Sequence, residues 1–69
     1  MTVNRNNEYT HTQTEPSSVW TIVHNFGFIP NSYTTTLTGD EIEGIVTPVD
    51  QNTIQITFSE PVSGYAYLS

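Results

Sequence analysis

The sequence predicts an all-β protein, and three features of its 69 residues indicate this class. Apolar and polar residues alternate in several short segments, and a period of two places alternate side chains on opposite faces of a strand. Turn-forming residues recur at intervals of roughly 8 to 12 residues, as in all-β domains. No stretch carries apolar residues at helical spacing over two turns. We therefore expect a compact antiparallel β-sandwich, immunoglobulin-like or similar, of about six strands.

The chain divides into a short arm and one domain. Residues 1–8 have no periodicity and are rich in asparagine, so we expect a flexible N-terminal arm. Residues 9–69 suffice for a single core. The sequence contains no cysteine, which excludes a disulfide framework and a thiolate zinc site. The domain must depend on packing or on association with other chains.

The first two predicted strands are separated by a proline turn. In Tyr9–Thr14 every second residue is threonine, and the opposite face carries Tyr9, His11 and Gln13. Pro16 predicts a turn over Glu15–Ser18. Val19–His24 is rich in aromatic and β-branched residues, with Trp20, Ile22 and His24 on one face. Because Val19, Thr21 and Val23 occupy the other face, we expect this strand to be covered on both sides.

A corner and a hairpin follow. Asn25–Pro30 is the predicted corner, where Gly27 can adopt a positive φ and Phe26 and Phe28 can close the end of the core. Ser32–Thr38 and Ile42–Thr47 are the predicted third and fourth strands, joined by a turn at residues 38–41. Pro48 indicates that the fourth strand lies at an edge or ends there.

The last two predicted strands have the clearest faces. After a turn at residues 50–52, Thr53–Phe58 alternates strictly, so Ile54, Ile56 and Phe58 should face the core. Glu60–Gly64 is predicted to be a turn. In Gly64–Leu68, Ala66 and Leu68 share one face, and Tyr65 and Tyr67 share the other.

Charge and hydropathy exclude some partners and locations. Seven acidic residues against one basic residue give a formal net charge of -6, which would repel nucleic acid and anionic lipid. No apolar stretch approaches the ~20 residues that span a membrane. The N-terminus lacks the apolar segment of a secretory signal, so we expect the chain to stay in the cytoplasm where it is made.

No motif indicates catalysis, a metal or a cofactor. A metal or acid–base role for His11 or His24 would need carboxylates or a second histidine nearby, and the spacing of the sequence indicates none. Hydrogen-bonded structural roles are favoured for both. Asp40, Glu41 and Glu43 gather at a turn but do not form a calcium-loop pattern, so a solvated acidic turn is favoured. There is no Gly-x-Ser-x-Gly elbow. We expect a protein that is not an enzyme, with no catalytic residue, metal site or cofactor.

Tyrosine is the residue type that most suggests an interaction surface, since it gives rigid amphipathic contact area at low entropy cost. The candidate surface comprises Tyr9, His11, Tyr33, Tyr65 and Tyr67, with Phe26 and Phe28 as candidate loop contacts. Two interpretations stay open for Tyr65 and Tyr67. They either form an outward patch or complete a hydrophobic layer against the N-terminal strand.

Three segments in order carry a resemblance to a known class of module: Tyr9–Gln13, Trp20–Gly27 followed by Pro30, and Ile56–Leu68. Together they resemble a small β-module of tailed-bacteriophage tail-fibre, baseplate and related virion proteins. The similarity spans Tyr9 to Leu68, and its most specific parts are the Trp-x-Ile-x-His-Asn-x-Gly run and the Phe58–Leu68 segment. In the proteins that it resembles, such modules are often parts of longer chains.

The resemblance implies a virion structural protein that assembles with other virion proteins and with copies of itself, and it implies no catalytic residue. Homotrimers are common among such fibre proteins, but this sequence leaves the number of copies open. Two alternatives remain: a host receptor- or glycan-binding module, which requires exposed aromatics such as Tyr65, Tyr67, Trp20, Phe26 or Phe28, and a capsid decoration protein.

Overall fold

The computed structural model describes residues 8–69, and every regular element in this range is a β-strand. The strands are β1 (Tyr9–Val23), β2 (Ser32–Thr36), β3 (Glu41–Ile42), β4 (Ile45–Asp50) and β5 (Thr53–Leu68). All their pairings are antiparallel, so the predicted all-β antiparallel class is confirmed. The predicted arm lies outside the described residues except for Glu8, which is exposed and precedes β1.

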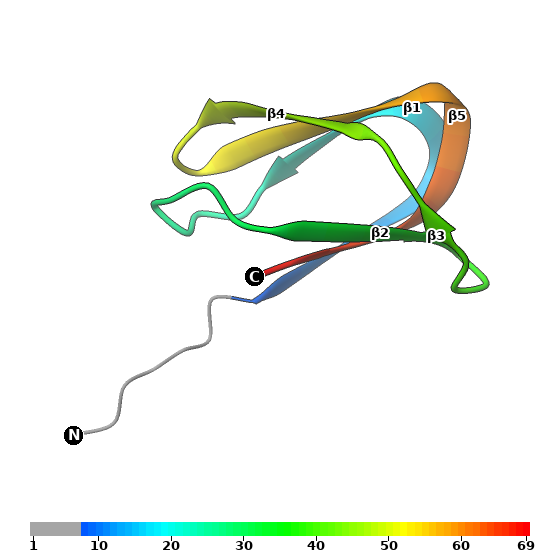
Figure 1. The fold of residues 1–69 in the computed structure, drawn as a ribbon, viewed down its shortest axis with the longest axis horizontal. Helices are drawn as coiled ribbons and strands as arrows, with labels where there is room; N and C mark the ends of the chain where they lie inside the picture. The colour runs from blue at the N-terminus through cyan, green and yellow to red at the C-terminus, as the bar shows by residue number, and fades with distance from the viewer. Residues whose placement is uncertain (1–7) are drawn as a thin grey trace.

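The five strands belong to one sheet that folds over itself. Its order is β1-β5-β2-β3, and β4 also pairs with β5. The first half of β5 lies between β1 and β4, and its second half lies between β1 and β2. Figure 1 shows β1 and β5 curving together at one end of the molecule, so that the two halves of the sheet face each other. These layers are halves of a single sheet, so a sandwich of two separate sheets is not confirmed.

The bends of β1 and β5 replace two predicted turns. Glu15–Ser18 and Glu60–Gly64 do not separate strands but lie within β1 and β5, so prediction of turns there was wrong. The register explains the bend. Between the pairs Gln13↔Gly64 and Ser17↔Val62, β1 advances four residues and β5 two, and by Val19↔Thr57 β1 has advanced two more and β5 five.

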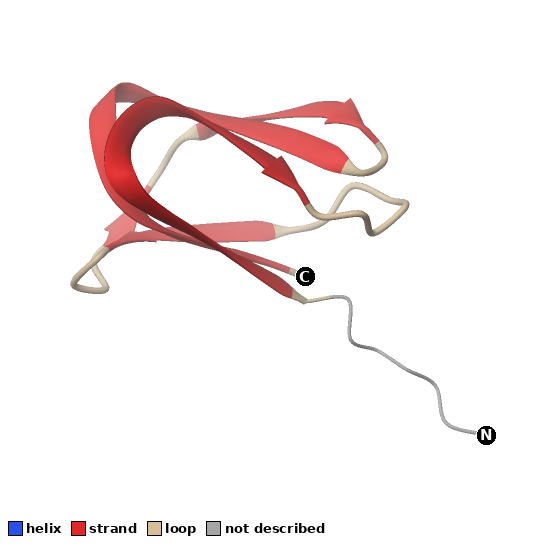
Figure 2. Ribbon diagram, turned by 180° about the vertical axis from the view of Figure 1, so that it is seen from behind, coloured by secondary structure: helices blue, strands red, loops and turns tan. Residues whose placement is uncertain are grey.

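Such bulges bend a strand sharply while leaving it continuous. Pro16 and Pro61 are both exposed in this irregular stretch, and neither has a partner in the β1–β5 register. A proline is tolerated in a sheet at such a place because no ladder hydrogen bond requires its missing N–H. Figure 2 shows the same continuous bend from behind.

The predicted hairpin is present, but its second strand is interrupted. β2 ends at Thr36 rather than Thr38, because the Gly39 N–H donates to the Thr36 carbonyl at 3.1 Å and the Thr36 N–H donates to the Asp40 carbonyl at 2.7 Å. The predicted strand Ile42–Thr47 is divided at Gly44 into β3, which pairs with β2, and β4, which pairs with β5. The chain thereby passes from one layer to the other.

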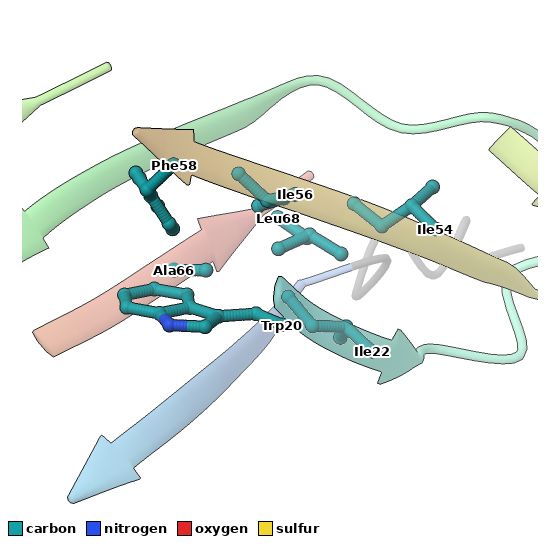
Figure 3. Close-up of a cluster of buried hydrophobic side chains, with 7 residues drawn as sticks. All are labelled: Trp20, Ile22, Ile54, Ile56, Phe58, Ala66 and Leu68. Carbon is teal, nitrogen blue, oxygen red and sulfur yellow. The ribbon is translucent and has the colours of Figure 1, made fainter. Parts of the chain in front are cut away.

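Seven buried apolar side chains from β1 and β5 form the core between the layers (Figure 3). They are Trp20, Ile22, Ile54, Ile56, Phe58, Ala66 and Leu68. The predicted inward faces of Thr53–Phe58 and Gly64–Leu68 are therefore confirmed, as is the shared inward face of Trp20, Ile22 and His24. All these core residues lie on the two longest strands, so the β1–β5 pair is the centre of the fold.

Trp20 hydrogen-bonds to both strands on the inner side of the bend. Its indole N–H lies 3.0 Å from the Ser17 carbonyl and 3.2 Å from the Val62 carbonyl, and Ser17 and Val62 are the pair at the middle of the bend. The ring centroid of Phe58 is 4.7 Å from that of Trp20. One fully buried side chain thus supplies both apolar filling and the donor for carbonyls at an irregular part of the ladder.

The prediction that residues 19–24 are covered on both sides was wrong. Val19 and Val23 are 44% and 54% exposed, and within residues 8–69 β1 pairs with β5 alone. Periodicity could not distinguish the faces, because β-branched residues suit both the core and the exposed surface of a sheet.

Candidate interaction surfaces

Three tyrosines from neighbouring strands lie together on the outside of the sheet half built from β2 and the second part of β5. Tyr65 and Tyr67 are two residues apart on β5, and Tyr33 on β2 pairs directly with Tyr67. The Tyr33 and Tyr67 ring centroids are 6.2 Å apart, and those of Tyr65 and Tyr67 are 6.1 Å apart. We call Tyr33, Tyr65 and Tyr67 the tyrosine ladder.

The ladder faces solvent rather than the core. Tyr33 is 50% exposed and Tyr67 is 42% exposed, whereas the alternate β5 residues Ala66 and Leu68 are buried. Thr10 and Thr12 of β1 pair with Tyr67 and Tyr65 and therefore border the ladder on the same outer face. Of the two interpretations of Tyr65 and Tyr67, the structure supports an outward patch.

Tyr9 lies near the ladder but on the opposite face of its strand. It pairs with Leu68 at the start of β1 and is 41% exposed because it lies at the end of the layer. Its side chain and those of Thr10, Tyr33 and Tyr67 contribute to an open hollow of about 260 Å³. This end of the ladder therefore combines aromatic walls with a shallow recess.

His11 is directed into the fold and does not join the ladder. It pairs with Ala66, is partly buried, and its ring centroid lies 5.8 Å from that of Trp20. Its Nε2 lies 2.8 Å from the side-chain oxygen of Gln13. These contacts give His11 a packing role at the core edge.

The corner residues separate in the same way. The Phe26 backbone N–H donates to His24 Nδ1 at 3.1 Å, and the Phe26 ring packs against the core at a centroid distance of 4.8 Å from the His24 ring. Phe28 is 42% exposed. Asn25 and Gly27 have φ values of 61° and 80°, which confirms the positive φ predicted for Gly27. Of the two predicted loop contacts, Phe28 is therefore exposed to solvent, whereas Phe26 is partly buried.

Sequence reasoning missed a second surface, on the outside of the other sheet half. Thr57 of β5 pairs with Val19 on one side and with Ile45 on the other, and Ile45 is 71% exposed. Thr53, Gln55 and Val23 continue this face, which is uncharged except for Asp50, the partner of Thr53 at its end. We call Val19, Val23, Ile45, Thr53, Gln55 and Thr57 the aliphatic face. The polar residues at 53, 55 and 57 were the signal that this side of the sheet faces outward.

The acidic turn is organised by its own hydrogen bonds. The Thr38 hydroxyl donates to Asp40 Oδ2 at 3.4 Å, and the Asp40 N–H donates to the Thr36 hydroxyl at 3.1 Å.

Within residues 8–69 no three histidine or acidic side chains gather closely enough to hold a metal ion. The same part of the chain has no helix long and apolar enough to cross a membrane.

The two candidate interaction surfaces are thus outward sheet faces. Trp20 is fully buried, so it cannot contact a ligand in this fold. The chain matches no protein-family model, no curated protein and no solved structure.

Proposed function

We propose that this chain is a structural protein of a tailed-bacteriophage virion, in a tail fibre, the baseplate or another tail-associated position, and that it acts by assembling with other protein chains. The observation that carries the proposal is the aliphatic face, where Val19, Val23 and Ile45 are 44%, 54% and 71% exposed. The resemblance of Trp20–Gly27 and Phe58–Leu68 to virion modules supports the setting.

The aliphatic face has the composition of a contact surface. Isolated exposed apolar residues are ordinary, but these three pair directly with Thr57 and Thr53 on one sheet face that is charged only at its end, at Asp50. The chain has a formal net charge of -6, yet Asp50, opposite Thr53, is the one carboxylate among the residues paired on this face. Covering this face with another protein removes the exposed branched side chains from water.

The proposal includes the chain's partners and place. Its partners are other virion proteins and copies of itself, it carries no cofactor and performs no catalysis, and it reaches the virion from the host cytoplasm. The negative charge argues against nucleic acid and membrane as partners.

Replacing Ile45 with lysine is expected to reduce incorporation of the chain into particles by at least about tenfold, because a buried unpaired ammonium costs more than 1.4 kcal/mol at an interface. Ile45 is highly exposed, so the variant should fold normally. Incorporation is measured by quantitative mass spectrometry of purified phage particles whose genome carries the substitution.

Leu37→Lys is the matched control, since Leu37 is 46% exposed but lies in the turn after β2. Incorporation of Leu37→Lys should equal that of the wild type. Absence of the wild-type chain from purified particles would refute the virion role. A copy number in the hundreds, on the scale of the capsid shell, would favour a decoration protein over a tail component.

The tyrosine ladder supports a second candidate function, a module that binds a neutral glycan on the host surface. Sugar C–H groups pack on exposed aromatic rings, and Tyr33 and Tyr67 present such rings beside the hollow of about 260 Å³. Thr10 offers a hydroxyl at the same hollow.

For this candidate, Tyr67→Ala is expected to weaken binding to a neutral oligosaccharide by about tenfold, by the loss of one stacking contact worth roughly 1.4 kcal/mol. Phe28→Ala is the control, because Phe28 has the same 42% exposure but lies on the corner loop. Binding is measured on a glycan array and then by NMR titration. Equal losses in both variants, or no glycan bound by the wild type, would exclude the candidate.

A further inference from the structure

We propose that a second copy of the chain pairs with the free edge of β1 over Val19–Val23, in an antiparallel arrangement whose twofold axis passes Thr21. The inference rests on the proposed assembly role and names one partner and the edge that receives it. The result would be a continuous sheet across two copies, in the order β4-β5-β1 followed by β1-β5-β4 of the second copy.

The edge of β1 is open in the described part of the chain. Between residues 8 and 69, β1 pairs along one side with β5 and with no strand along the other. Val19–Val23 has regular register with Thr53–Thr57, so its backbone is straight enough to pair again on its other side. The Val19 N–H and C=O bond the Ser17 hydroxyl, which would have to release them on pairing, and the remaining unpaired N–H and C=O groups along such an edge are a template for another strand.

The other edges carry features that oppose pairing. β3 has two residues, begins with Glu41 and is followed by Glu43. β4 contains Pro48, which has no N–H to donate, and an irregularity before Asp50. The first part of β1 is bounded by Glu8 and Glu15. Among these edges, only Val19–Val23 has no acidic residue or proline within it or within two residues on either side, from 17 to 25.

Because both copies are negatively charged, they can pair only along an edge that has no carboxylates. Two copies that each carry a formal charge of -6 repel one another, and opposed carboxylates at an interface would add to that repulsion. Pairing over Val19–Val23 brings no carboxylate of β1 opposite another. The acidic residue that follows in space, Asp50, lies on β4, two strands away from Val23.

The segment is also self-complementary. Its outward residues read Val19, Thr21, Val23, which is the same in both directions about Thr21. A twofold axis at Thr21 would place Val19 of one copy opposite Val23 of the other and the two Thr21 residues opposite each other. Such isologous matching is what a twofold interface requires, and cross-strand pairs of β-branched residues stabilise it.

A single introduced cysteine tests the register, because the chain has no native cysteine. Directly opposite residues in an antiparallel pair have Cα atoms roughly 4.5 to 5.5 Å apart, within the range of about 4.4 to 6.8 Å that a disulfide spans. We expect Thr21→Cys to form a covalent dimer on mild oxidation. Val19→Cys and Val23→Cys should cross-link when mixed, and each should form little disulfide alone.

Light scattering on the full chain over a wide concentration range should show a dimer, and Thr21→Lys should weaken it at least about tenfold by placing like charges together at the axis. Thr47→Lys is the matched control: Thr47 pairs with Gln55 opposite Thr21, at the other edge of the same sheet half. Thr47→Lys should leave the dimer intact.

A monomer at every concentration, a trimer, or cross-linking by Thr47→Cys instead of Thr21→Cys would overturn the proposal. So would a dimer that survives Thr21→Lys but is lost when residues 1–7 are removed, since those residues would then make the contact. A monomer that is still found in purified particles overturns this inference alone. Absence from the particles overturns the virion role and leaves a measured dimer standing.

Discussion

Replacing Trp20 with alanine is expected to leave the chain unfolded at room temperature. The side chain is fully buried, and removing an aromatic side chain from a core costs about 3–5 kcal/mol. A domain of this size without disulfides has roughly that much stability in total. The carbonyls of Ser17 and Val62 would also lose their shared donor at the bend. Far-UV circular dichroism and a urea titration measure the loss.

Two variants separate the contributions of Trp20. Trp20→Phe keeps a ring but removes the N–H, so it should fold with a free energy of unfolding lowered by about 1–3 kcal/mol. Val19→Ala, on the neighbouring exposed position, should change stability by less than about 1 kcal/mol. A cooperative transition for Trp20→Ala at the wild-type urea midpoint would contradict the central place given to this residue.

Replacing Gly64 with alanine is expected to have an effect of similar size for a different reason. Gly64 is buried on β5 between Gln13 of β1 and Thr36 of β2. A Cβ at Gly64 would overlap the Thr35 carbonyl oxygen and lie 2.9 Å from its carbonyl carbon. These are backbone atoms, so β2 could make room only by separating from β5. We expect a loss of at least about 3 kcal/mol, the upper range for overpacking.

Gly44→Ala provides a graded comparison. A Cβ there would meet Ile56 Cγ2 at 2.7 Å and Phe58 Cε1 at 2.8 Å, which are side-chain atoms that can shift. Its expected cost is about 1–3 kcal/mol. Ser63→Ala, adjacent to Gly64, should be nearly neutral. Thermal unfolding ranks the three variants, and Gly64→Ala more stable than Gly44→Ala would show that the Thr35 backbone yields more easily than the core side chains.

Alternation along the chain was sufficient to predict the class and the inner faces. Ile54, Ile56 and Phe58 are separated by polar residues, so only one face of that segment could be buried, and it is. Ala66 and Leu68 are distinguished from Tyr65 and Tyr67 in the same way. The hairpin turn was predictable because Gly39 supplies the positive φ of 98° that the turn requires.

The connections between layers could not be predicted from local sequence. Pro16 and Pro61 are turn signals in isolation, yet the structure places the two stretches against each other and absorbs both prolines in bulges. That outcome depends on a pairing between residues far apart in the chain. The break of residues 42–47 at Gly44 also depends on tertiary packing, because Gly44 lies against Ile56 and Phe58.

The candidate surfaces were predictable only in part. Tyr65 and Tyr67 were placed on one face by spacing, but the addition of Tyr33 required the β2–β5 register. Spacing places His11 on the same strand face as Tyr9 and Gln13 but does not show whether that face is the inner or the outer one. In the structure the His11 ring is directed towards Trp20, because β1 bends over the core. The aliphatic face was missed because branched residues occupy both sides of Val19–Val23.

The position of β5 in the sheet has a consequence for synthesis of the chain. β1, β2 and β4 each pair with β5. Among the four strands that precede β5, the described pairings include only the short one between β2 and β3. Until residues 53–68 leave the ribosome, β1 therefore has no partner for its 15 residues. We expect the nascent chain to remain open to proteases and chaperones until residues 53–68 have emerged, and then to collapse in a single step.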